Sequence, residues 1–372
     1  MKILHLLYES KGDYFGVGGV GMRAYEIYSR LKIRHDITLV CKKYPGATDK
    51  EIGGLRHIFV GTESKSLTKC LLSYARDAAY FVRQYGNDFD LVVEDFSPAI
   101  PRLLPRFFRT RPVILQVQGF TGNLYFKKYN PAYALFLFLS ERVSPHMYSN
   151  FIFITCDTAR RLSISNKKHL GIIPNGISHE LLETPVGNGT YLLYFGRIDI
   201  YGKGLDTLLD GYAEFVRSNP DIKLVIAGDG RDRKKFEAMI RRMPDQARKN
   251  IEMPGWISDD EKAEVIGKAI SVIFPSRHEV QSIAVLEAMA CGKPVIASNI
   301  QEFAYVTDIG SGILFRTGDP SALAEAMKKI LRSSDRRAMG QKGRDWVRNF
   351  TWDRIALQYE KFLQDVISRE NQ

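Results

Sequence analysis

The sequence has little of what marks disulfide-rich, metal-binding or membrane-spanning proteins. Its four cysteines stand far apart without a C-x-x-C pair, which argues against a disulfide framework or a zinc site and favours buried thiols in a reducing compartment. Its seven histidines lack ligand spacing, so no metal is expected. No apolar run reaches the roughly 18 residues that a spanning helix needs. The cysteines are Cys41, Cys70, Cys156 and Cys291.

The N-terminus also lacks the marks of a secretory leader. MKILHLLYES has one lysine and a short apolar run that fits a first buried strand. It has neither the length nor the small-residue cleavage site of a signal peptide. We therefore expect a cytoplasmic protein.

An excess of basic residues is confined to the first half. Residues 1–178 contain 25 Lys and Arg against 14 Asp and Glu, whereas residues 179–372 contain 28 of each kind. The net charge of +11 therefore belongs to the first half. A one-sided basic surface suits an anionic partner such as lipid headgroups, a phosphorylated acceptor or nucleic acid, and a merely soluble basic face is the alternative.

Short apolar runs alternate with amphipathic stretches along the chain. This alternation predicts parallel sheets covered by helices, and the number of runs predicts an α/β protein of two doubly wound, Rossmann-like domains facing across a cleft. The polar segment SHELLETPVGNGT marks a division into domains at 1–178 and 190–350 with a linker at 179–189. The expected strands are 2–8, 36–41, 57–60, 91–94, 113–117, 151–155, 171–173, 191–195, 223–227, 271–274 and 294–297.

Two glutamates give the clearest sign of a site in the second half. The segment FPSRHEVQSIAVLEAMACGKPVIAS reads as strand, loop, helix and strand, with Glu279 in the loop and Glu287 in the helix. Residues eight apart in a helix lie roughly 80° from eclipsed and two turns apart, so both carboxylates can approach one extended ligand. Backbone N–H groups at the helix start, at Ser282, Ile283 and Ala284, would add an anion site.

A second segment supplies positive charge. In GRIDIYGKGLDTLL, Arg197 and Lys203 can converge on one anion, while Gly202 and Gly204 let the backbone approach it. Arginine grips phosphate oxygens with a planar fork and lysine adds a point charge. Together they could balance the charge of a diphosphate without a metal ion.

These two segments together resemble glycosyltransferase family 4, which has the GT-B fold and retains the anomeric configuration. FGRIDIYGKG, PSRHEVQSIAVLEAMACGKPVIAS, GGVG, IIPNGIS and TWDRIALQYEKFL all fit that family. The resemblance implies that the second domain binds a nucleotide sugar and the first its acceptor. It also implies a terminal helix, 351–372, that crosses back onto the first domain.

The resemblance also assigns roles to residues of the second domain. Arg197 and Lys203, with the backbone at Gly196, would hold the donor diphosphate, and Glu287 would accept hydrogen bonds from the ribose hydroxyls. Glu279 would lie against the transferred sugar and stabilise positive charge in the transition state. Where many relatives have Gly-Phe-Gly after the first glutamate, this chain has Val280, Gln281 and Ser282, which leaves the sugar and the base, uracil or guanine, open.

A glycine-rich loop follows the first strand. In YFGVGGVGMRAYEIYSRL, Gly18 and Gly19 open an amphipathic helix, and in the resembled family this loop approaches the donor phosphates. A dinucleotide site is the alternative, but the glycine spacing does not match its fingerprint. The second alternative is that the loop is a plain turn between a strand and a helix.

Polar residues at strand ends are further candidates in the first half. Gln118 stands where many relatives have a histidine; it cannot be a general base, but it can donate a hydrogen bond to a sugar hydroxyl or the leaving group. Glu94 and Asp95 could meet the acceptor hydroxyl or could cap the next helix. The D-x-D of Asp88 and Asp90 precedes a strand, so we reject it as a metal-bound diphosphate site.

Basic and aromatic residues are interleaved at 102–111, RLLPRFFRTR, and at 123–139, NLYFKKYNPAYALFLFL. This mixture suits the surface of an anionic membrane and a lipid-linked acceptor, and it places the protein at the inner face of that membrane. The alternative is one face of a buried helix.

The expected reaction is transfer of a hexosyl group from a UDP- or GDP-sugar to a lipid-linked or glycan acceptor in cell-envelope polysaccharide or glycolipid synthesis. The family implies a same-face displacement without metal or cofactor, in which the leaving diphosphate takes the acceptor proton. An epimerase or a phosphorylase on the same fold is the alternative. Nucleic-acid binding is not expected, because no compact recognition motif is visible.

Overall fold

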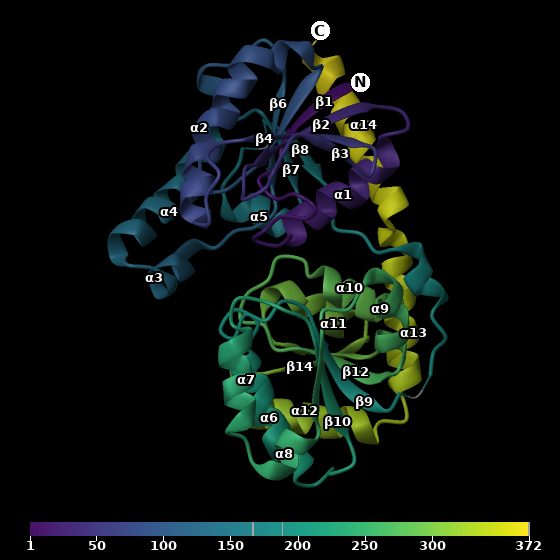
Figure 1. The fold of residues 1–372 in the computed structure, drawn as a ribbon. Helices are drawn as coiled ribbons and strands as arrows, with labels where there is room; N and C mark the ends of the chain where they lie inside the picture. The colour runs from purple at the N-terminus through teal and green to yellow at the C-terminus, as the bar shows by residue number, and fades with distance from the viewer. Residues whose placement is uncertain (166, 188, 371–372) are drawn as a thin grey trace. The chain divides into compact units, whose positions relative to one another are not determined.

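The computed structural model describes residues 1–165, 167–187 and 189–370, and the chain divides into two compact units. The first unit comprises Met1–Asn175 and Trp352–Gln372, and the second comprises Gly176–Thr351. Each unit has a mostly parallel sheet with helices on both faces (Figure 1), so the prediction of two doubly wound α/β domains is confirmed. Asn188 of the expected linker and residues 371–372 of the expected terminal helix lie outside the described residues.

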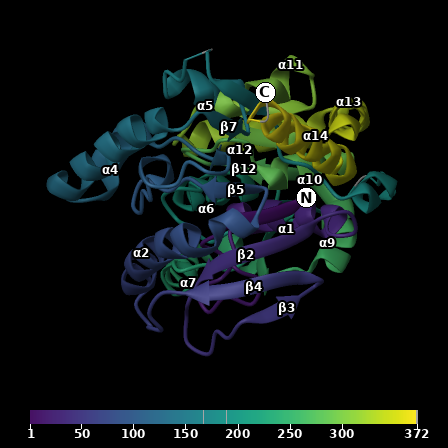
Figure 2. The same cartoon turned by 90° about the horizontal axis from the view of Figure 1, so that it is seen from above.

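The sheet of the first unit has the order β3-β4-β2-β1-β5-β6-β7-β8. All neighbours pair in parallel except β3 and β4, which form an antiparallel edge, visible in Figure 2 beside β2. The central strands are mostly apolar because helices cover both faces, and the polar residues they do contain, such as Glu94 and Gln116, are buried. The strands are β1 (Lys2–Leu6), β2 (Asp36–Lys42), β3 (Lys50–Ile52), β4 (Leu55–Val60), β5 (Leu91–Asp95), β6 (Val113–Val117), β7 (Asn150–Phe153) and β8 (His169–Ile172).

The sheet of the second unit has the order β11-β10-β9-β12-β13-β14, with every pair parallel. Parallel strands bring their carboxyl ends to one edge, where the loops after β9, β10 and β12 meet. The strands are β9 (Tyr191–Phe195), β10 (Lys223–Ala227), β11 (Ile251–Gly255), β12 (Ala269–Phe274), β13 (Val295–Ser298) and β14 (Gly312–Phe315).

Local sequence fixes where several helices begin. Ser258 and Glu261 form a capping box at α9, and the side chain of Asp319 accepts a hydrogen bond from the N–H of Ala322 at α12. The helices of the first unit are α1 (Gly19–Leu31), α2 (Leu67–Tyr85), α3 (Tyr125–Lys128), α4 (Pro131–Val143), α5 (Cys156–Arg161) and α14 (Trp352–Glu370). Those of the second are α6 (Leu205–Val216), α7 (Arg233–Arg241), α8 (Asp245–Lys249), α9 (Asp259–Gly267), α10 (Ile283–Ala290), α11 (Ala304–Asp308), α12 (Pro320–Arg332) and α13 (Arg336–Val347).

Helix α14 belongs to the first unit and packs on α1 (Figures 1 and 2). The hydroxyl groups of Tyr28 and Tyr359 lie 3.3 Å apart in its buried contact with α1. At the rim, Arg30 Nε lies 2.8 Å from an oxygen of Asp353. The fold of the first unit is therefore completed by residues that follow the whole second unit in the sequence.

The change from the first unit to the second falls between Asn175 and Gly176, earlier than the polar segment at 179–189. Residues His179–Glu183 form a 3-10 helix whose Leu181 and Leu182 are buried in the core of the second unit, so this segment is part of that unit. The chain passes from one unit to the other at two points, and these points lie side by side. The N–H of Ile177, just after the first, donates to the carbonyl of Phe350, just before the second, at 2.8 Å.

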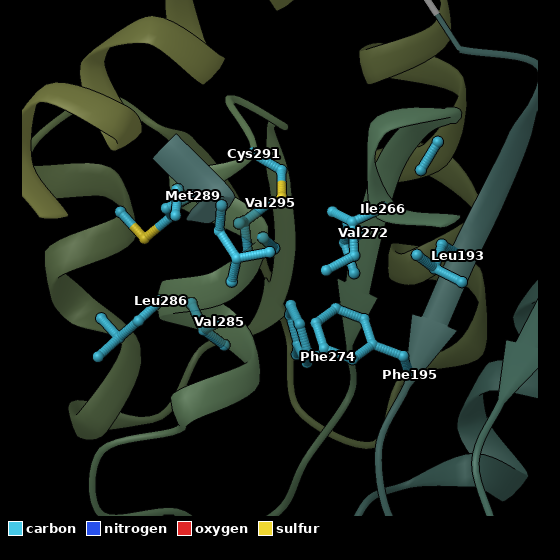
Figure 3. Packing of buried hydrophobic residues seen from close by; sticks show 14 of the residues in the cluster. Leu193, Phe195, Ile266, Val272, Phe274, Val285, Leu286, Met289, Cys291 and Val295 are labelled. Atoms are coloured by element: carbon cyan, nitrogen blue, oxygen red, sulfur yellow. The ribbon is translucent and has the colours of Figure 1, made fainter. Parts of the chain in front are cut away.

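The core of the second unit fixes helix α10 against the sheet (Figure 3). Val285, Leu286 and Met289 of the helix are fully buried in one cluster with Phe195 and Val272 of the strands. Burial of each such side chain is worth about 1.5–3 kcal/mol. The apolar residues of the helix thus hold the intervening Glu287 at a fixed height above the sheet.

Lys293, in the turn between α10 and β13, is buried, and its ammonium group donates to the carbonyl of Gly187 at 3.0 Å. Burial lowers the pKa of Lys293 to about 8. Because the unfolded chain then binds the proton more tightly, this lysine destabilises the fold below about pH 8 and ceases to do so as the pH rises through the unfolded pKa of about 10.4. We expect the free energy of unfolding of the wild type to rise between pH 8 and pH 10 relative to that of Lys293→Met. Urea unfolding of both proteins at the two pH values checks this, and a constant difference would contradict it.

Candidate active site

The loop after β9 is held in shape by hydrogen bonds that its backbone N–H groups donate. The N–H of Gly196 donates to the carbonyl of Ala227 at 2.9 Å, which ties the start of the loop to β10. Asp199 folds the loop back, since its side chain accepts from the N–H of Gly202 at 2.9 Å and its carbonyl accepts from the N–H of Lys203 at 3.0 Å. Arg197 is exposed at the beginning of this loop.

This loop and the loop after β12 are locked together. Gly204 has φ +63°, and a Cβ there would lie 2.0 Å from the carbonyl oxygen of Pro275, so only glycine fits. Arg277 grips the carboxylate of Asp206 through two hydrogen bonds of 2.8 Å, and its N–H donates to the carbonyl of Gly202 at 3.0 Å. The positions of side chains on one loop are therefore fixed relative to those on the other.

Lys203 and Glu279 meet between these two loops. The ammonium nitrogen lies 2.5 Å from Oε1 of the carboxylate, which also accepts from the hydroxyl of Ser276 at 2.8 Å. The side chains are 23% and 12% exposed, so the pair is shielded but still reachable. An ammonium group has three hydrogens and can therefore hold this carboxylate and an incoming anion together.

The first turn of α10 follows directly. Ser282 is the N-cap residue, in an extended conformation, and Ile283 and Ala284 open the helix. The first N–H groups of a helix have no intrahelical acceptor and favour an anion. The structure thus places the N-cap three residues, and the first helical residue four residues, after Glu279.

Glu287 is paired with a lysine that the sequence did not single out. Its Oε1 accepts from the ammonium group of Lys262 at 2.8 Å, and the same group lies 2.8 Å from Asp259. Burial alone would lower the pKa of Lys262, but the charge of Glu287 raises it above the ordinary value. Lys262 lies in the unremarkable helical run of α9, so no motif could have pointed to it.

Tyr305 of α11 is a second residue that sequence reasoning missed. Its hydroxyl is buried, and no group within 1–165, 167–187 and 189–370 pairs with it. Burial, together with the nearby charge of Glu279, raises the pKa of Tyr305.

In the first unit, the N–H groups of the glycine-rich loop donate hydrogen bonds to a carboxylate of the chain itself. The carboxylate of Glu9 accepts from the N–H of Gly18 at 2.9 Å and from that of Gly21 at 2.8 Å, so it caps α1. A Cβ on Gly18 would lie 2.8 Å from this carboxylate, whereas Gly19, the first residue of α1, has open space around it. Burial raises the pKa of Glu9, against the lowering effect of the two N–H groups.

Gln118 is oriented by a buried carboxylate. Its Nε2 donates to Oδ1 of Asp95 at 2.8 Å, as does Nε2 of Gln116. The other oxygen of Asp95 lies 2.9 Å from Nε2 of the fully buried His5. Because the amide nitrogen of Gln118 is directed at Asp95, its carbonyl oxygen points the other way, and this half-buried side chain offers a ligand an acceptor as well as the donor expected.

Glu94 and Asp95 do not reach an acceptor. Each is 1% exposed, and Asp95 is engaged with the three side chains just described. Glu94 lies 3.0 Å from Nε of Arg102 and accepts from the hydroxyl of Tyr148 at 2.7 Å. Burial raises the pKa of Glu94. The expectation that these carboxylates meet an acceptor hydroxyl is therefore corrected: their partners lie within the core of the first unit.

The D-x-D lies at the amino end of β5, where Asp90 accepts from the N–H of Lys2 at 2.8 Å. Among the residues that the structure describes, no three His, Cys, Asp or Glu side chains are grouped so that they could hold a metal ion.

Comparison with solved structures defines the class of fold. The structure matches sucrose-phosphate synthase from Thermosynechococcus elongatus with a TM-score of 0.80 over 99% of each chain, at 19% identity. Its two parallel-sheet units therefore have the GT-B architecture of glycosyltransferases.

Residues 183–346 match the family model described as "Glycosyl transferases group 1". The predicted resemblance to a glycosyltransferase family is confirmed over these residues.

Curated relatives agree with this assignment. A phosphatidyl-myo-inositol mannosyltransferase of Mycobacterium leprae is 30% identical over 203 residues, which are 52% of this chain and 53% of the relative. A GDP-mannose-dependent alpha-(1-6)-phosphatidylinositol dimannoside mannosyltransferase of Mycobacterium tuberculosis is 30% identical over 166 residues, 44% of this chain and 41% of the relative. The match thus spans about half the length of these relatives or less.

Proposed function

We propose that this protein is a retaining, metal-independent glycosyltransferase that moves a hexosyl group from a UDP- or GDP-sugar to a lipid-linked or glycan acceptor. The observation that carries the proposal is the pair of Lys203 and Glu279, in which Glu279 lies three residues before the N-cap of α10, with Arg197 exposed on the same loop as Lys203. Two cations and a helix N-terminus suit a diphosphate, and a carboxylate next to them suits the attached sugar.

Each residue has a role in the proposed reaction. Arg197 and Lys203 neutralise the diphosphate as it leaves, and the N–H groups of Ser282, Ile283 and Ala284 add to this stabilisation. Glu279 binds sugar hydroxyls and stabilises positive charge at the sugar ring, while Glu287, braced by Lys262, accepts from the ribose hydroxyls. The leaving diphosphate takes the proton of the acceptor hydroxyl, so no protein base is required.

The unit that binds the donor is the second, and we assign the acceptor to the first. The names of the relatives favour GDP-mannose as the first donor to test and an inositol phospholipid as the first acceptor.

Thermal stabilisation by a panel of UDP- and GDP-sugars without added metal tests the donor site. One donor should raise the unfolding temperature of the wild type, and the rise should be lost in Arg197→Ala and Glu287→Gln. The matched control is Arg217→Ala, an exposed arginine at the other end of α6 from the donor loops. Unfolding temperatures without ligand show whether each variant is folded.

The same panel separates the alternatives. Slow hydrolysis of the donor and transfer to a lipid acceptor support the proposal. Conversion of the donor to another nucleotide sugar without an acceptor would instead show an epimerase, and use of free phosphate as the acceptor would show a phosphorylase. If no nucleotide sugar stabilises the wild type, the donor-site assignment is wrong.

A further inference from the structure

Helix α4 has large apolar side chains on both its inner and its outer face. Ala134, Leu137 and Glu141 are buried and face the body of the first unit. Phe136, Leu139 and Val143 lie roughly 180° away around the helix axis, given 100° per residue. A helix that is apolar all round is normally buried, so the outer face of α4 needs a partner.

The outer face forms part of a larger apolar surface, here called the α3–α4 surface. Four of its side chains are aromatic, and its charged members are lysines. In Figures 1 and 2, α4 extends away from the sheet of its unit. The surface consists of Phe126 (47% exposed), Tyr129 (47%), Tyr133 (40%), Leu135 (49%), Phe136 (46%), Leu139 (49%) and Val143 (61%), together with Lys127 and Lys128.

The aromatic side chains of this surface are ordered by one another. The rings of Tyr129 and Tyr133 meet edge to face at 5.3 Å, and those of Tyr133 and Phe136 stack at 6.2 Å. Asn130 caps α4 by accepting from the N–H of Tyr133 at 3.0 Å. The surface is therefore preformed and loses little conformational entropy when it is covered.

The exposed charged residues of the α3–α4 surface are all positive. Glu141 is the only acidic residue of 123–143, and its buried carboxylate accepts from the N–H groups of Thr121 and Gly122 at 2.8 Å each. Arg142 lies over the ring of Phe138 at 3.6 Å. An apolar and aromatic face with lysines and no exposed carboxylate complements the headgroups and acyl boundary of an anionic bilayer.

Residues 102–111, the other segment that the sequence suggested for membrane contact, do not form such a surface. Arg102, Leu104 and Phe108 are buried, at 5%, 0% and 5% exposure, so residues 102–111 present no continuous apolar face. Within the described part of the chain, no helix is long and apolar enough to cross a bilayer.

We propose that the α3–α4 surface docks the protein on an anionic lipid bilayer, with its aromatic rings at the headgroup level and Lys127 and Lys128 against lipid phosphates. This inference deepens the proposed function, since a lipid-linked acceptor would be presented at that bilayer. A second copy of the chain fits less well, because a symmetric contact would bring the lysines of both copies to one place.

Co-sedimentation of the full chain with vesicles tests the docking without any sugar donor. The wild type should bind vesicles of phosphatidylglycerol and phosphatidylcholine, and bind less in high salt. Phe136→Asp with Leu139→Asp should weaken binding by at least about tenfold, because two inserted apolar side chains are lost. Lys127→Gln with Lys128→Gln should weaken binding to the anionic vesicles.

The control is Ile33→Asp, which changes an apolar residue of the same unit that is 86% exposed and lies outside the α3–α4 surface, and it should bind as the wild type does. Failure of the wild type to bind, or equal binding by the Phe136 and Leu139 variant, overturns the proposal. So does a wild-type dimer in sedimentation equilibrium that the same variant dissociates while vesicle binding is unchanged. Donor hydrolysis without vesicles is scored separately, so failure of the donor site and failure of docking are distinguishable.

Discussion

Replacing Lys203 by methionine is expected to lower kcat for sugar transfer by about 100- to 1,000-fold. The ammonium group lies 2.5 Å from Glu279 and is the cation best placed to stabilise both that carboxylate and a leaving diphosphate. The free energy of unfolding should change by no more than ~1 kcal/mol, because partly exposed ion pairs contribute little. Transfer rates at saturating donor, together with urea unfolding, provide the measurement.

Lys223→Met is the matched control for this prediction. Lys223 also forms an ion pair, with Glu252 at 2.6 Å, but both residues are about half exposed and lie on β10 and β11 away from the loops. This variant should keep the wild-type rate. A Lys203→Met enzyme that transfers sugar within a few-fold of the wild-type rate would show that the pair with Glu279 has no part in the chemistry.

Replacing Arg102 by methionine is expected to reduce the free energy of unfolding by about 3–5 kcal/mol, because it leaves the carboxylate of Glu94 buried without a countercharge. Both side chains are at most 2% exposed, and the guanidinium group also donates to the carbonyl of Asp95 at 2.6 Å. Chemical denaturation followed by circular dichroism measures the loss. Arg106→Met, at an exposed arginine of the same segment, should be close to neutral.

A second variant separates the lost charge pair from lost packing. Arg102→Met combined with Glu94→Leu removes both charges and should recover most of the stability, as replacement of buried ion pairs by apolar residues often does. If the double variant is no more stable than Arg102→Met, the contacts of Arg102 with Tyr74 and the backbone matter more than its charge.

Most of the fold could be predicted from apolar runs, because strands covered on both faces are largely apolar. The strands that were missed, β3, β11 and β14, lie at sheet edges or are short and half exposed. In β11 half-buried and exposed residues alternate, and a proline interrupts the pattern. Such strands are specified by their neighbours in the sheet and leave a weak signal in the sequence.

The candidate site was predictable only where its residues lie in short motifs. Lys203 and Glu279 stand in recognisable segments, and the structure brings them into contact. Lys262 was not predictable, because it reaches Glu287 from another helix. The misplacement of Glu94 has the same origin: its partner Arg102 comes from a segment whose sequence reads as a surface.

The completion of the first unit by α14 has a consequence for the order of folding during translation. The ribosome makes the residues of β1 to β8 first, but Tyr359 and its helix are made only after the whole of 176–351. The second unit is continuous in sequence and can fold as soon as it emerges, whereas the first must wait with the α14-facing side of α1 exposed. The unit that is synthesised first is therefore the one that is finished last, in contrast to the usual N-terminal-first order of multidomain chains.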